Sequence, residues 1–140
     1  MNLTYKYVII GGGIAGTTCV ETLIKILESQ KTASEVTNNE QDKIIIKPLL
    51  ISPDKLKSLK LKQAHTELLK EYDVCEETEG NIGNFIEGVD FLYMKKSVKF
   101  IDELEKIVYL EDSHGSESES IRFEKVCICT GARPKKLNWV

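Results

Sequence analysis

The sequence predicts an α/β fold in which a small parallel sheet carries a three-stranded β-meander at one side. Two observations predict it: a strand, glycine turn and helix pattern at the start of the chain, and a series of short β-branched runs in its last third. The length of 140 residues suits one domain, and 41 % hydrophobic with 29 % charged residues is typical of a globular protein. We therefore treat residues 1–140 as one unit.

The first element is a strand followed by a helix. Residues 5–10 are aromatic and β-branched, which is typical of a buried strand. Three consecutive glycines, 11–13, end that strand. From Ile14 to about Glu28 the apolar residues recur at helical spacing, so this stretch is expected to be a helix.

The second strand is expected after a polar insertion. Residues 29–42 are polar without a clear period and are interpreted as a surface loop. The apolar runs 44–46 and 49–51 flank Pro48 and together predict a strand that is bulged at the proline.

A helical region is predicted next. Ser52-Pro53-Asp54 is typical of a helix start, with Ser52 as the N-cap. Leucines with many lysines between them over residues 55–72 predict one or two amphipathic helices with a solvated basic face. The acidic, glycine-containing residues 76–84 are interpreted as a loop.

The last third is predicted to be β-structure. Segments at about 91–101, 106–111 and 120–124 are expected to form the meander, with a turn at residues 112–116. Residues 126–129 predict a separate, final buried strand, and a turn follows it. The parallel sheet is expected to contain the first, second and final buried strands.

The glycine turn matches the dinucleotide fingerprint G-x-G-x-x-G in the strand-to-helix context that the fingerprint requires. Gly11 permits a tight turn, Gly13 lets the backbone approach a pyrophosphate, and Gly16 allows the helix to pack closely on the strand. Free N–H groups and the positive end of the helix dipole then meet the phosphate charge. At the end of the second strand, Ser52 stands where the fingerprint usually has a ribose-binding acid.

The back of the chain adds a second motif. Its β-meander and the strand end Thr130-Gly131-Ala132-Arg133-Pro134, together with the front Gly-Gly-Gly-Ile-Ala-Gly, resemble the first part of the FAD domain of class I and II pyridine nucleotide-disulfide oxidoreductases. The resemblance covers nearly the whole chain and implies a Rossmann-like, incomplete FAD/NAD(P)-binding domain. Cys129 stands where that family usually has alanine, and the redox pair C-x-x-x-x-C of the classical disulfide reductases is absent after the second strand.

The resemblance also implies which residues bind the cofactor FAD. Residues of the glycine turn would line the pyrophosphate, Ser52 would lie near the ribose, and Val98 would meet the adenine edge. Thr130, Gly131 and Ala132 would pass the flavin side, and Lys62 would face the flavin ring. The implied cofactor-binding set is Gly11, Gly13, Ile14, Ala15, Gly16, Ser52, Lys62, Val98, Thr130, Gly131 and Ala132. We name no catalytic residue on this chain.

By resemblance, the chain is the FAD-binding portion of a NAD(P)H-dependent flavin oxidoreductase, in which a nicotinamide passes hydride to the flavin. The family's NAD(P)H domain and its C-terminal return to the FAD domain are not in these 140 residues, so the chain alone is expected to be inactive. One alternative is a truncated, non-catalytic module that binds a nucleotide or a partner; the resemblance suggests the tRNA-ligase machinery as that partner. Another alternative is a plain NAD-binding domain.

Composition excludes several function classes. A net charge of −3 argues against direct binding to nucleic acid, and no apolar run reaches the roughly 20 residues of a membrane helix. The four cysteines have no framework spacing, which favours a reducing compartment, cytoplasmic and/or nuclear. Cys127 and Cys129 are predicted to be small core residues and Cys19 to pack between helix and sheet. No metal site is expected, because no further ligand is close to the C-x-C pair in sequence.

Overall fold

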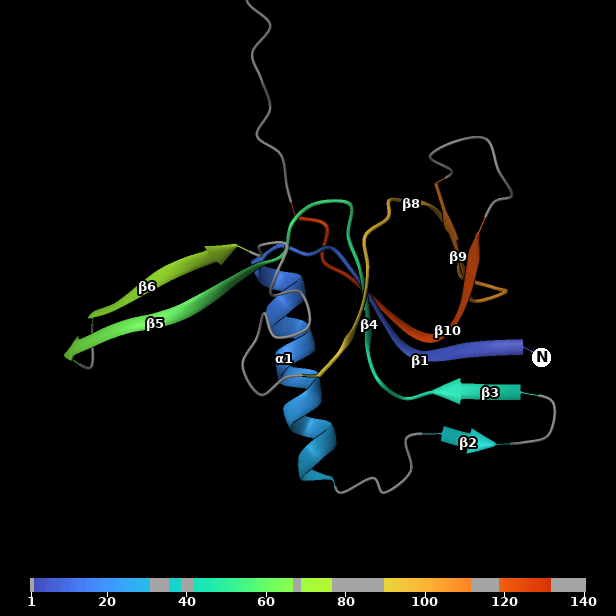
Figure 1. Cartoon of the computed structure of the whole chain (residues 1–140), viewed down its shortest axis with the longest axis horizontal. Helices are drawn as coiled ribbons and strands as arrows, with labels where there is room; N and C mark the ends of the chain where they lie inside the picture. The colour runs from blue at the N-terminus through green and yellow to red at the C-terminus, as the bar shows by residue number, and fades with distance from the viewer. Residues whose placement is uncertain are drawn as a thin grey trace, which may run out of the picture.

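The computed structural model describes residues 2–30, 36–38, 42–66, 69–76, 90–111 and 119–131. A twisted sheet lies at the centre, and one helix crosses one of its faces (Figure 1). The elements, in chain order, are β1 (Asn2–Ile10), α1 (Ile14–Ser29), β2 (Val36–Asn38), β3 (Asp42–Ile45), β4 (Leu49–Ile51), β5 (Lys57–Thr66), β6 (Leu69–Glu76), β7 (Leu92–Met94), β8 (Val98–Asp102), β9 (Ile107–Leu110) and β10 (Ser120–Ile128).

Strand β1 is at the centre of the larger sheet, which has eight strands in the described part of the chain. It pairs in parallel with β10 on one side and with β3 and β4 on the other, and β4 pairs in parallel with β7. Strands β8, β9 and β10 are antiparallel neighbours. The predicted α/β class, a parallel sheet with a β-meander, is therefore confirmed.

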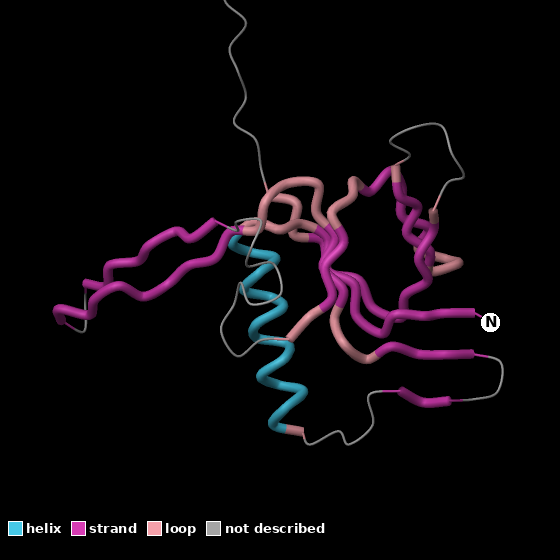
Figure 2. Tube along the Cα trace, viewed as in Figure 1, coloured by secondary structure: helices cyan, strands magenta, loops and turns pink. Residues whose placement is uncertain are grey.

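The two faces of the sheet carry two apolar clusters because successive side chains of a strand point to opposite sides. Ile9 and Leu50 pack on the α1 side with Val20 and Ile24 of the helix. The opposite face carries a cluster with the meander, made of Val8, Ile10, Leu49, Ile51, Val108, Leu110, Ile121 and Phe123. Figure 2 shows the helix and the meander on opposite sides of the central strands.

The expected loop at 29–42 contains regular structure at its ends and centre. Helix α1 includes Ser29, β3 begins at Asp42, and Val36–Asn38 form the short strand β2, antiparallel to β3. The loop interpretation is therefore wrong at Ser29, Val36–Asn38 and Asp42. Strand β2 forms although its sequence is mostly polar, because its backbone groups pair with those of β3. At Pro48, the expected single strand is divided into β3 and β4, since proline has no N–H for the sheet.

The predicted helices at 55–72 are not present. This region contains β5 and the first half of β6, an antiparallel hairpin that extends away from the sheet in Figure 1. The overlooked signal is a period of two in Ser58-Leu59-Lys60-Leu61-Lys62, which suits a strand. In the hairpin register Leu59 stands opposite Val74 and Leu61 opposite Tyr72.

Two predictions in the last third also need correction. The expected segment 91–101 is two strands, β7 in the parallel part of the sheet and β8 in the meander. The expected segments 120–124 and 126–129 are largely one strand, β10, which pairs with β9 at its start and with β1 along most of its length. The loop predicted at 76–84 is wrong at Glu76, which is the last residue of β6. Residues 77–84 and the predicted turn at 112–116 lie outside the described residues.

The carboxyl end of β10 is more open than expected. Cys127 is exposed, and Ile128, which points to the other face, is 61 % exposed. The described elements thus cover neither face of the strand here, so the prediction that Cys127 is a core residue is wrong. Burial of a strand depends on what packs over it, which a local apolar run does not show.

In the described part of the chain, no helix has the length and apolarity to cross a membrane.

Candidate functional site

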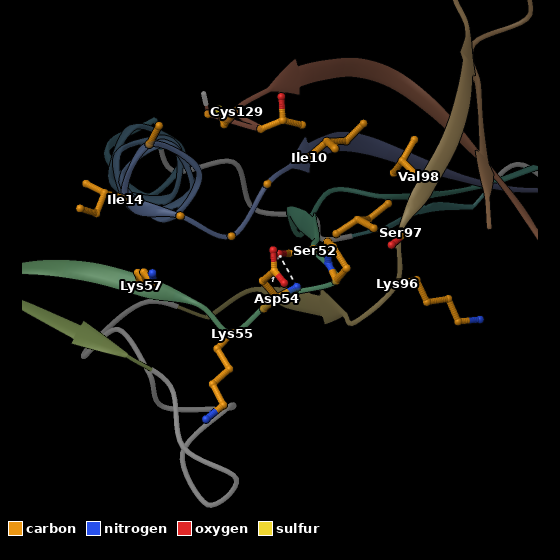
Figure 3. Close-up of a pocket in the computed structure, with 18 of the residues that line it drawn as sticks. Ile10, Ile14, Ser52, Asp54, Lys55, Lys57, Lys96, Ser97, Val98 and Cys129 are labelled. Carbon is orange, nitrogen blue, oxygen red and sulfur yellow. Dashed lines mark hydrogen bonds between the residues drawn. The ribbon is translucent and has the colours of Figure 1, made fainter. Parts of the chain in front are cut away.

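A cavity of about 650 Å³ lies beyond the carboxyl ends of β1 and β4, where the glycine turn leads into α1 (Figure 3). Open α/β sheets bind ligands at this edge, outside the carboxyl ends of parallel strands. The lining residues are Ile10, Gly11, Gly12, Gly13, Ile14, Ala15, Ile51, Ser52, Pro53, Asp54, Lys55, Lys57, Lys96, Ser97, Val98, Glu111, Cys129, Thr130 and Gly131.

The first glycine makes the turn tight. Gly11 has a φ of 114°, which an L side chain rarely adopts, and a Cβ there would clash with the carbonyl oxygen of Cys129. Its N–H donates to the carbonyl of Ile51 at 2.9 Å, and the Cys129 N–H donates to the carbonyl of Ile10 at 2.7 Å. The turn is therefore held between β4 and the end of β10.

The next three glycines differ in what surrounds them. A Cβ on Gly12 would meet Ser52 and Leu56, and a Cβ on Gly16 would clash with the carbonyl of Gly11. Gly13 has open space around the place of its missing Cβ. Gly16 does not line the cavity, so its hydrogen side chain serves the close packing of α1 on the turn. Gly13 is the glycine that leaves room for a ligand.

The beginning of α1 faces the cavity with Ile14 and Ala15. The N–H groups of a helix's first turn have no acceptor within the helix, and here the first helical bond runs from the Thr17 N–H to the Gly13 carbonyl at 3.1 Å. Gly13 supplies no side-chain cap, and the first turn contains no acid. This helix end therefore offers N–H donors and a positive dipole to an anion.

Residues 52–57 form a second wall, tied to the glycine turn by hydrogen bonds. The Lys57 N–H donates to the Gly12 carbonyl at 2.8 Å, and the buried Thr17 hydroxyl lies 2.5 Å from the Lys57 carbonyl. Ser52 is buried, and its hydroxyl accepts a hydrogen bond from the Asp54 N–H at 3.3 Å. Ser52 thus closes a turn before β5 instead of capping a helix as predicted.

Charged side chains surround the cavity. Lys55, Lys57 and Lys96 contribute three cations, whereas Asp54 and Glu111 contribute two carboxylates. In Figure 3 the side chains of Lys55 and Lys96 extend outward from the cavity. Lys96 also forms an ion pair with Glu119. Because Lys55 and Lys96 extend outward and Lys96 is paired with Glu119, the helix end is the feature that favours a ligand with phosphate groups.

Several of these residues were missed by sequence reasoning. The sequence predicts Lys55 and Lys57 on the solvated face of a helix, but residues 55–56 are not helical, β5 begins at Lys57, and both lysines line the cavity. Lys96 lies between two β segments that were read as one. Asp54, an acid two residues after the position at which the fingerprint usually has its ribose-binding acid, also lines the cavity.

The structure brings most of the predicted cofactor-binding residues together. Val98, Thr130 and Gly131 all line the cavity, and Gly131 has a φ of 76°. Lys62 belongs to β5, in the hairpin, and not to a helix. Ala132 lies outside the described residues. The predicted residues that line the cavity are Gly11, Gly13, Ile14, Ala15, Ser52, Val98, Thr130 and Gly131.

A group of three thiols lies beside the glycine turn. Cys19 of α1, Cys127 of β10 and Cys129 have their sulfur atoms within 4.8 Å of one another, and the Cys127 and Cys129 sulfurs are 3.5 Å apart. Burial raises the pKa of the Cys19 thiol to about 12, with the neighbouring Cys127 adding to the shift. Burial likewise raises the pKa of Cys129. Sequence reasoning found no third ligand because α1 supplies it from a distant position.

Comparison with known proteins gives a consistent result. The family model described as "Pyridine nucleotide-disulphide oxidoreductase" matches residues 5–139. The chain is 25 % identical over 130 residues to a human protein named "Pyridine nucleotide-disulfide oxidoreductase domain-containing protein 1", and 26 % identical over 133 residues to the zebrafish (Danio rerio) protein of the same name. These matches cover 93 % and 95 % of this chain but only 22 % and 23 % of those relatives.

Proposed function

The chain belongs to the pyridine nucleotide-disulphide oxidoreductase family, and we propose on this basis that its cavity binds FAD through the pyrophosphate and adenosine. The observation that carries the proposal is the open space at Gly13, where the N–H groups at the start of α1 meet the cavity. A pyrophosphate has the charge and the acceptor oxygens that such a site requires.

Different residues of the cavity suit the pyrophosphate and the adenosine of FAD. Ile14 and Ala15, with the N–H groups of the first helical turn, would hold the pyrophosphate. Ser52 and Asp54 stand where the family's ribose-binding acid is expected, and the Asp54 carboxylate is the group able to accept from ribose hydroxyls. Val98 would lie at the adenine edge, and Thr130 and Gly131 would lie toward the flavin.

For the whole protein we propose NAD(P)H-dependent flavin oxidoreduction. Bound FAD would supply the redox chemistry by accepting a hydride from a nicotinamide. The residues of this chain would bind and orient the cofactor, and we propose no proton-transfer or bond-breaking role for any of them. The chain spans about a fifth of the relatives it matches, so we expect it to bind FAD without turning over NAD(P)H.

The test is a titration of the purified chain with FAD, followed by visible absorbance and by the melting temperature, with NAD⁺ in a parallel titration. We expect saturable FAD binding that raises the melting temperature, and competition by ADP, which shares the proposed contacts. Stronger binding of NAD⁺ than of FAD would favour a plain NAD-binding domain. Failure of FAD to bind or to raise the melting temperature would contradict the proposal.

The sharpest variant is Gly13→Ala. Its φ of −74° suits alanine and its Cβ meets no protein atom, so the fold is expected to be unchanged. The added methyl group would occupy space needed by the pyrophosphate, and FAD affinity should fall about tenfold or more, a loss of ~1.4 kcal/mol. Thr18→Ala, an exposed change on the same helix and outside the cavity, is the control and should keep wild-type affinity.

A further inference from the structure

We propose that Cys19, Cys127 and Cys129 form a binding site for one soft, thiophilic metal ion of the Cu(I) class. The three residues come from separate places, since Cys19 lies on α1, Cys127 is in β10 and Cys129 follows that strand. Cys129 lines the cavity proposed for FAD, whereas Cys19 and Cys127 do not. This site therefore goes beyond the proposed function.

The spacing of the sulfur atoms suits a single ion. All three lie within 4.8 Å of one another, and the Cys127 and Cys129 sulfurs are 3.5 Å apart. With a metal–sulfur bond of about 2.3 Å, the sulfurs of a trigonal site are about 4.0 Å apart. The observed separations bracket this value, so small rotations of the side chains are enough to bring three sulfurs to one ion.

The donor set points to the class of metal. Within the described residues the group offers three ligand atoms, and all of them are sulfur. Thiolates select soft ions such as Cu(I), whereas Mg²⁺ and Ca²⁺ require oxygen ligands. Structural Zn²⁺ is held almost always by four protein ligands. In the described part of the chain the set is three sulfurs without a fourth protein donor, which favours Cu(I) over Zn²⁺.

An ion could reach the three thiols from solvent and would be partly shielded once bound. Cys127 is exposed to solvent, whereas Cys19 and Cys129 are half-buried between α1 and the sheet. Packing alone does not account for an exposed thiol directed toward two others. Metal binding would replace the proton of each thiol, so one ion and three thiols give a metal tristhiolate and release three protons to water.

A bound ion would link α1 to the end of β10, next to the glycine turn. The main chain already brings these elements close, because a Cβ on Gly16 of α1 would lie 3.7 Å from the Cys129 Cβ. Since an ion bound only to the folded state stabilises it, the metal should raise the melting temperature. This readout does not depend on the presence of FAD.

The test is an anaerobic Cu(I) titration of the reduced 140-residue chain against a chromophoric Cu(I) chelator, with Zn²⁺ in a parallel titration. We expect one Cu(I) per chain, a higher melting temperature, and weaker binding of Zn²⁺. Cys127→Ser and Cys19→Ser should each lower Cu(I) affinity by about tenfold or more, or ~1.4 kcal/mol. Cys75→Ser is the control, because Cys75 is the remaining cysteine of the chain and is not one of the three proposed ligands, and it should keep full affinity.

Three outcomes would overturn the proposal. One is the absence of stoichiometric Cu(I) binding, and another is tighter binding of Zn²⁺ than of Cu(I). The third is an equal loss in Cys75→Ser and Cys127→Ser, since an unfolded chain would bind through any of its cysteines. Cys127→Ser should also retain FAD affinity, because Cys127 lies outside the FAD cavity. The metal proposal and the FAD proposal can therefore fail separately.

Discussion

At the scale of single residues, the glycine turn shows how one residue type fills different roles. Gly11 needs its positive φ and its missing side chain, since the Cys129 carbonyl occupies the space of a Cβ. Gly16 needs only the missing side chain, because the Gly11 carbonyl lies against it. Gly13 needs neither for folding, and its empty space belongs to the cavity. These roles explain why a substitution at Gly13 should affect binding, whereas one at Gly16 should affect stability.

Thr17→Val tests the hydrogen bond that joins α1 to the second wall of the cavity. The Thr17 side chain is buried, and its hydroxyl is 2.5 Å from the Lys57 carbonyl. Valine keeps the shape but leaves that carbonyl without this donor, so unfolding free energy should fall by about 1–3 kcal/mol. The measurement is urea unfolding. Thr18→Val, an exposed position on the same helix, is the control, and an equal loss in both variants would refute the assignment.

Cys19 should react slowly with alkylating reagents. Burial and the neighbouring thiols raise its pKa from 9.0 to about 12, which lowers the reactive thiolate fraction at pH 8 by about a thousandfold. Iodoacetamide labelling followed by mass spectrometry should therefore modify the exposed Cys127 before Cys19. The folded state should also lose stability as the pH rises from 9 toward 12, since the unfolded chain releases this proton first. Equal labelling of Cys19 and Cys127 at pH 8 would contradict the burial argument.

At the scale of elements, the segment between β4 and β5 decides the shape of the cavity. Leu56 is completely buried in the cluster that includes Val20 and Ile24 of α1, and it also lies against Gly12. This anchor holds the wall formed by residues 52–57 over the glycine turn. The predicted helix would have placed Lys55 and Lys57 on a solvated face, so the course of this short segment determines the charge of the site.

Leu56→Ala tests this anchor. Removal of a fully buried leucine side chain should cost about 2–5 kcal/mol of unfolding free energy, because the cavity it leaves only partly collapses. Leu104→Ala is the matched control, since Leu104 is 95 % exposed and its loss should stay within about 0.5 kcal/mol. Chemical denaturation measures both. Similar values for the two variants would show that Leu56 does not hold the wall.

At the scale of the whole molecule, one sheet joins two apolar clusters that have different partners. The α1 side contains Leu50, and the meander side contains Leu110. Both clusters contain alternate residues of β1 and β4. Unfolding of these two strands would therefore expose both clusters to water. We expect the two clusters to unfold together as a single domain.

The pair Leu50→Ala and Leu110→Ala tests this cooperativity. Each variant should lose about 2–5 kcal/mol, and both should shift the circular dichroism and tyrosine fluorescence transitions by the same amount. Because the residues belong to clusters on opposite faces, the losses should add to within about 0.5 kcal/mol in the double variant. A Leu110→Ala variant whose helical signal melts as in the wild type would show that the meander side unfolds separately.

The sequence by itself determined the framework of this protein. The strand, glycine turn and helix over residues 5–28, the parallel sheet and the β-meander follow from local periodicity and from glycine chemistry, which act over a few residues. The same local motifs named most of the residues that line the cavity. Lys62 is predicted on a helix, whereas the structure has β5 there.

Only the tertiary structure decided which elements residues 55–72 form, which lysines reach the cavity and which cysteines meet. Leucine spacing in that region suits a helix and a strand almost equally, and the cross-strand pairs of β5 and β6 decide between them. Cys19 meets Cys127 and Cys129 because α1 packs beside the end of β10, more than 100 positions later in the chain. Such contacts depend on long-range packing, which local sequence patterns do not record.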